Sequence, residues 1–163
     1  MPVLYLKDIN WGLTPSSLIS LILLICSFLI APIFIQRAIK IKTVIHYTAS
    51  FYAGFVEEII FRGIIFGLTY YLTNSYLEAT VVSSIAFGVW HLKNLAFMTW
   101  KSTIIQVIYA GSIYGPIFAI IRILTGDIYL SIFLHISNDV YHSIAPGIFR
   151  RYKLAVPLKY VQD

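Results

Sequence analysis

The chain has 163 residues, of which 59% are hydrophobic and only 12% are charged, and its mean hydropathy is +0.82. Soluble domains carry about 25% charged residues, so this composition excludes an ordinary soluble domain, which would expose large apolar patches. The net charge of +5 does not indicate nucleic-acid binding, because the basic residues lie between apolar runs, where they set membrane orientation. We therefore predict an all-α polytopic membrane protein with a single domain over residues 1–163 and the lipid bilayer as its surroundings.

Five apolar runs approach the length of about 20 residues that a helix needs to cross a bilayer. The second run is longer than one perpendicular crossing needs, so we expect it to tilt, kink or begin at the interface. The fourth run contains Gly111, Gly115 and Pro116, which allow close helix packing and a bend. In chain order the runs are Ser16 to Gln36, about Thr43 to Tyr71, Leu77 to about Met98, Ser102 to Leu124, and Ile128 to about Ser143.

The basic residues agree with five crossings. One side of the membrane would receive only Lys7 and Arg122. By the positive-inside rule, the sequence predicts a multi-pass integral membrane protein with its N-terminus outside and its C-terminus in the cytoplasm. The other side would receive nine lysines and arginines, namely Arg37, Lys40, Lys42, Lys93, Lys101, Arg150, Arg151, Lys153 and Lys159.

The second run holds three ionisable residues, Glu57, Glu58 and Arg62. Such residues are costly at membrane depth and usually functional, facing a cavity or a partner. Glu58 and Arg62 are four residues apart, so we expect them to pair on one helix face, a pair that could also be purely structural. Glu57 is offset by about 100° on the helix and lacks this arginine partner.

Two further runs carry ionisable groups that could meet Glu57. The third contains His91, and the fifth contains His135 and Asp139, which share a helix face at a spacing of four. Counted from the outer ends, Glu57 and His91 lie about 20 Å deep and His135 about 12 Å deep. Singly, His91 could be an interfacial residue and the other two an interhelical hydrogen-bonding pair. Together they predict a polar cavity within the membrane, enclosed by about five helices.

Three motifs in this order resemble those of one protein family. They are Glu-Glu-x-x-x-Arg at residues 57–62, Phe-x-x-x-His at 87–91, and His-x-x-x-Asp at 135–139. They resemble the CPBP family of intramembrane proteases, named for CAAX-protein and bacteriocin processing and also called the Abi family. The resemblance covers residues 55–141 as a catalytic core. It implies an intramembrane endopeptidase whose water is activated by glutamate and histidine.

The resemblance also implies a role for each matching residue. Glu57 corresponds to the glutamate that activates water, and His91 to the histidine that shares this water. His135 and the residue four positions later correspond to the groups that stabilise the oxyanion. Glu58 and Arg62 correspond to a supporting pair.

One position departs from the family pattern, because Asp139 stands where many members have asparagine. A carboxylate cannot donate a hydrogen bond to an oxyanion unless it is protonated. Two alternatives stay open: Asp139 orients His135, or the neighbouring Asn138 is the donor. The chain is also short, so it resembles a minimal core that would need a homo-oligomer or another partner to close its cavity.

We favour a mechanism without a cofactor, because the chain lacks the His-Glu-x-x-His string of zinc proteases. The expected substrate is a membrane-tethered or hydrophobic peptide, such as a CAAX-type C-terminus, a leader or a C-terminal sorting segment. The alternative is zinc or another divalent metal, with two histidines and two carboxylates as ligands. These ligands would be Glu57, His91, His135 and Asp139.

Two other function classes compete with proteolysis. A non-catalytic bacteriocin-immunity or binding membrane protein would use the same cavity only to hold a partner. A proton-coupled transporter would use the buried carboxylates and histidines as a proton relay. The transporter is disfavoured, because no inverted repeat is visible and five spans are few for that class.

Overall fold

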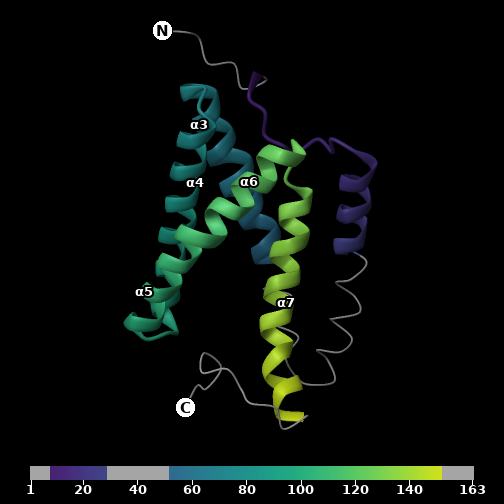
Figure 1. Ribbon diagram of the computed structural model, residues 1–163. Coiled ribbons are helices and arrows are strands. Elements are labelled where there is room, and N and C mark those ends of the chain that lie inside the picture. Colours follow the sequence, from purple (N-terminus) through teal and green to yellow (C-terminus); the bar gives the residue numbers. More distant parts are fainter. Residues whose placement is uncertain (1–7, 29–51, 152–163) are drawn as a thin grey trace.

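The computed structural model in Figure 1 describes residues 8–28 and 52–151. Regular structure within these ranges is entirely helical, which confirms the predicted all-α fold class. The end of the first predicted run, the start of the second, and the basic tail beyond Arg151 lie outside the described residues. The helices are Leu18–Phe28, a helix over residues 52–73 that ends in α3 (Phe66–Thr73), α4 (Tyr76–Trp90), α5 (Trp100–Tyr109), α6 (Gly115–Thr125) and α7 (Tyr129–Arg151).

The helix with the adjacent glutamates changes its winding just after them. Residues 52–58 are α-helical, Ile59–Ile65 are π-helical, and α3 completes the helix. Within the π-helical segment Phe61, Arg62 and Gly63 are buried. Such π-helical turns inside α-helices occur frequently at functional sites. The helix ends at Asn74, which adopts the left-handed conformation with φ of 52°.

The third predicted run changes its winding near its end, because α4 stops at Trp90 and a 3₁₀ helix continues to Ala96. The backbone N–H of His91 donates to the carbonyls of Gly88 and Val89, and the ring Nδ1 of His91 forms a hydrogen bond with the Phe87 carbonyl. The chain therefore tightens into a 3₁₀ helix over His91–Ala96, which presents its side chains in a different register from α4.

The fourth predicted run agrees with the structure, where α5, a π-helical segment Ala110–Tyr114 and α6 form one helix. Within the described residues, this 26-residue helix, Trp100–Thr125, is the one that is long and apolar enough to cross a membrane. The helix over residues 52–73 carries three charged side chains within its length. The number and direction of the crossings stay predictions.

The fifth helix is longer than predicted, because α7 continues from Tyr129 to Arg151 instead of ending near Ser143. Pro146 lies within this helix, since a proline removes one backbone hydrogen bond and need not end a helix. Before α7, the turn at Asp127 is fixed to the N-terminal segment. Ser16 N–H donates to Asp127 Oδ2 (2.8 Å), and Ile128 N–H donates to the Gly12 carbonyl (3.1 Å).

Helix α4 is the centre of the packing. It contacts α3, α6 and the segment Ala110–Tyr114, and α6 in turn contacts α7 (Figure 1). One close approach is at Gly88, where an added Cβ would lie 2.8 Å from the Val107 carbonyl oxygen. Phe61, Phe87 and Ala110 form a buried cluster beside this crossing. The packing therefore brings the second, third and fifth predicted runs around one buried region.

Candidate functional site

The buried centre of the site is the ion pair between Glu58 and Arg62. Arg62 Nη1 donates to Glu58 Oε1 at 3.0 Å, and both side chains are 0% exposed. Arg62 Nη2 donates to the Gly115 carbonyl at 3.2 Å. The guanidinium carbon lies 4.2 Å from the Phe87 ring centroid and 5.2 Å from that of Phe118. The predicted pair is confirmed, and its charge is further stabilised by the faces of two aromatic rings.

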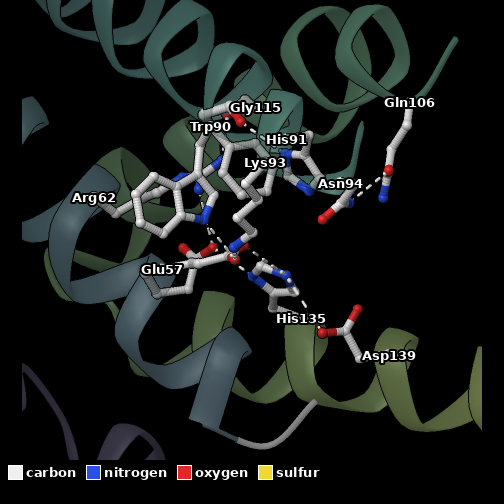
Figure 2. Close-up of polar contacts among 12 residues, drawn as sticks. Glu57, Arg62, Trp90, His91, Lys93, Asn94, Gln106, Gly115, His135 and Asp139 are labelled. Carbon is white, nitrogen blue, oxygen red and sulfur yellow. Dashed lines mark hydrogen bonds and ion pairs between the residues drawn. The ribbon is translucent and has the colours of Figure 1, made fainter. Parts of the chain in front are cut away.

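His135 from α7 joins this pair. Its Nδ1 lies 2.9 Å from Glu58 Oε1, and because the carboxylate accepts, Nδ1 carries the hydrogen. The His135 ring stacks on Phe118 with a centroid distance of 5.2 Å. Its Nε2 then faces two more carboxylates, at 3.9 Å from Glu57 Oε2 and 3.8 Å from Asp139 Oδ2 (Figure 2). A carboxylate that holds one imidazole nitrogen fixes the orientation of the other.

Glu57 has two hydrogen-bond donors that sequence reasoning missed. Its Oε1 accepts from Trp90 Nε1 at 2.8 Å and from Lys93 Nζ at 2.9 Å. From the sequence alone we assign Lys93 only to the basic side of the membrane, and we do not single out Trp90 as a site residue. Their spacing of three residues was the available signal, because residues three apart lie on the same side of a 3₁₀ helix.

His91 lies beside this cluster, at the point where α4 ends. Its Nδ1 lies 2.8 Å from the Phe87 carbonyl oxygen, so a neutral ring carries its lone pair on Nε2. His91 lies close enough to Glu57 and His135 to interact with them electrostatically. Among the described contacts it makes a direct hydrogen bond to neither of them. The structure therefore places His91 next to the other predicted residues without joining it to them.

Asn138 is held by a tyrosine that the sequence did not single out. Tyr114, in the π-helical segment before α6, donates its hydroxyl to Asn138 Oδ1 at 2.9 Å. Because the amide oxygen is engaged, the amide N–H groups point away from Tyr114 and can act as donors. Asp139 lies on the same face of α7 as His135, with 26% of its side chain exposed. Both predicted alternatives, Asp139 as the group that orients His135 and Asn138 as the oxyanion donor, stay predictions.

Two of the four candidate metal ligands, Glu57 and His135, are engaged by other side chains in the structure. Among the described residues, no group of three or more His, Cys, Asp or Glu side chains is disposed to hold a metal ion. Glu58 engages one nitrogen of His135, and Lys93 and Trp90 engage one oxygen of Glu57. The metal ligand set that we considered from the sequence, like the mechanism without a cofactor, stays a prediction.

Comparison with known proteins places these residues in a family. The chain is 41% identical over 75 residues to "Putative membrane peptidase YdiL" of Bacillus subtilis (strain 168), and the match covers 44% of this chain and 30% of that relative. The matched stretch therefore spans less than a third of the relative's length. No solved structure matches the chain. Residues 39–141 match the model of a family described as type II CAAX prenyl endopeptidase Rce1-like, in agreement with the resemblance seen in the motifs. Because this match covers more than half of the chain, the protein belongs to the Rce1-like family of type II CAAX prenyl endopeptidases.

Proposed function

We propose that the chain is an intramembrane endopeptidase that hydrolyses a peptide bond of a membrane-associated or hydrophobic peptide. The observation that carries this proposal is the position of Glu57 Oε2 opposite His135 Nε2, 3.9 Å away. This distance is too long for a direct hydrogen bond, and one water molecule can contact both atoms. A buried carboxylate and an imidazole facing the same water are the groups that amide hydrolysis needs.

In the proposed mechanism Glu57 takes a proton from the water as the water oxygen attacks the peptide carbonyl. Protonated His135 donates from Nε2 to the oxyanion that forms, while Glu58 holds Nδ1 and balances the charge. Glu57 then delivers the proton to the leaving nitrogen, so that no net proton is consumed. His91, with its lone pair on Nε2, would share the attacking water.

The proposal assigns different roles to the other site residues. Arg62 holds the Glu58 carboxylate in place, so it acts through Glu58 rather than on the substrate. Asn138 supplies an amide donor near the oxyanion, and Tyr114 positions that amide. We propose a CAAX-type C-terminus as the substrate class, because the family is described by that activity.

The test compares peptide termini in membranes of cells that carry the native chain or Glu57→Gln at equal abundance, measured by mass spectrometry. We expect new termini that depend on Glu57. Glu78→Gln is the matched control, because it makes the same change at an exposed glutamate in the first turn of α4. Identical termini in all three strains would overturn the proposal and favour the non-catalytic binding or immunity function.

A second experiment addresses the cofactor. Purified protein is assayed for cleavage after treatment with excess chelator, with and without added zinc. We expect full activity in chelator, because the proposed steps use only side chains of this chain. Loss of activity that zinc restores would replace this mechanism with a metal-dependent one.

A further inference from the structure

Lys93 is the part of the site that the proposed mechanism does not use. Its Nζ lies 2.9 Å from Glu57 Oε1, and its side chain is 45% exposed, against 7% for Glu57. Nζ also lies 4.2 Å from the Trp90 ring centroid. Lys93 therefore lies against the buried Glu57 carboxylate, while its own side chain is half exposed.

This ion pair is poorly suited to be a permanent structural bond. Ion pairs between two exposed side chains contribute only about 0–1 kcal/mol, and in this pair the half-exposed Lys93 stays accessible to other anions. Exchange of Glu57 for such an anion would also favour catalysis, because a cation on Glu57 stabilises its charged form and opposes proton uptake from water. In the structure, Glu57 is therefore paired with a half-exposed cation.

The other described cations near this region cannot take that role. Arg62 is fully buried and is engaged by Glu58 and the Gly115 carbonyl. Arg122 is also buried and donates to Asn10, at the end of α6 that contacts the N-terminal segment. An anion that approaches Glu57 from solvent would therefore meet Lys93 first.

We infer that Lys93 binds a carboxylate of the substrate, and that this binding releases Glu57 to act as the base. The inference rests on the proposed function and deepens it. It defines the substrate as a peptide with a carboxylate close to the scissile bond. A CAAX-type C-terminus has this chemistry, because only three residues separate its modified cysteine from the chain end.

The test measures binding in the Glu57→Gln background, where the proposed function allows no cleavage. The probes are two forms of one hydrophobic peptide that ends in S-farnesyl-cysteine, two aliphatic residues and methionine, one with a free C-terminal carboxylate and one with an amide. We expect the carboxylate form to bind about tenfold more tightly, as for one hydrogen bond between charged groups. Addition of Lys93→Met should reduce this ratio to about one.

Lys101→Met is the matched control. Lys101 also lies near a tryptophan ring, with Nζ 5.9 Å from the Trp100 centroid, and it makes no ion pair with the described residues. Lys101→Met removes the same positive charge as Lys93→Met and should leave the ratio of affinities for the two peptide forms unchanged. A third peptide, amidated but ending in glutamate, tells whether the site takes any carboxylate or only a terminal one, and either result supports the inference.

Two results would overturn the inference: an unchanged ratio in Lys93→Met, or equal or absent binding of both peptide forms in the presence of Lys93. Because binding is measured without cleavage, the outcome is separate from that of the proposed function. A protein that prefers the carboxylate through Lys93 but never produces Glu57-dependent termini would retain the inference as a binding site and contradict the protease.

Discussion

The adjacent residues Glu57 and Glu58 lie in two very different parts of the site. Glu58 belongs to what we call the closed end, formed by Glu58, Arg62 and the Gly115 carbonyl, where both charged side chains are fully buried. Glu57 belongs to the open end, formed by Glu57, Trp90 and Lys93, where the cation is half exposed. His135 contacts Glu58 with one nitrogen and faces Glu57 with the other.

A buried carboxylate can hold a neighbouring side chain in one orientation or take up a proton, and the two ends of the site are suited to different roles. At the closed end the charges are fixed by a buried cation, so Glu58 is suited to hold His135 in one orientation. At the open end the partner is a weakly held lysine, so Glu57 can change partners and take up a proton. The comparison predicts that changes at the closed end affect stability, whereas changes at the open end affect chemistry and specificity.

The largest effect is expected from Arg62→Ala at the closed end. This change leaves Glu58 buried without its cation, and the free energy of unfolding should fall by about 3–5 kcal/mol. Protein abundance and activity should fall together, as measured by immunoblot and by thermal unfolding in detergent. The double variant Glu58→Gln/Arg62→Met should recover abundance without activity. Normal abundance of Arg62→Ala would show that the pair does not stabilise the fold.

A smaller effect on catalysis is expected from Tyr114→Phe. Loss of one hydrogen bond to Asn138 Oδ1 should cost about 1 kcal/mol, or about fivefold in kcat, because the amide is then free to rotate. KM should change little, since Tyr114 acts through Asn138 rather than on the substrate. Tyr109→Phe, on the same helix and exposed, is the control. An unchanged kcat in Tyr114→Phe would show that Tyr114 does not position Asn138 for catalysis.

Asp127 lies outside both ends and tests whether a charged group there affects stability without affecting catalysis. It lies in the turn between α6 and α7, where burial acts to raise its pKa, but hydrogen bonds from Ser16 and Tyr129 outweigh burial and lower it. A carboxyl group whose pKa is lowered on folding stabilises the protein above the ordinary value of about 3.9, and this contribution is lost as the pH falls further. Asp127→Asn should therefore cost about 1 kcal/mol at neutral pH and less at pH 3.

The measurement is thermal unfolding of wild type and Asp127→Asn in detergent between pH 3 and pH 7. The difference in unfolding temperature should narrow toward low pH, while peptide cleavage at pH 7 stays close to wild type. A difference that does not depend on pH would show that Asp127 acts through its shape rather than its charge.

The sequence predicted the closed end better than the open end, for a physical reason. Glu58 and Arg62 are four residues apart on one helix, and the spacing persists through the π-helical turn well enough for the pair to form. Lys93 reaches Glu57 only because the chain tightens after Trp90, and hydropathy does not report that change in winding. Tyr114 reaches Asn138 across two helices, so its role depends on helix packing that one sequence does not reveal. The family motifs supplied His91 and His135, whose roles stay predictions.

The smallest effect is expected from Asp139→Asn, next to His135. Asp139 Oδ2 lies 3.8 Å from His135 Nε2, too far for a direct hydrogen bond, and Glu58 already fixes the other nitrogen of His135. An asparagine has nearly the same shape and adds a donor for the oxyanion, so activity should stay within about threefold of wild type. Asp139→Leu, which removes the polar group altogether, is the comparison and should lose more. The measurement is the steady-state rate at which each variant cleaves one peptide. If Asp139→Asn is inactive while folded, the carboxylate itself takes part in the reaction, and the division of work between Glu57 and Glu58 must include a third carboxylate.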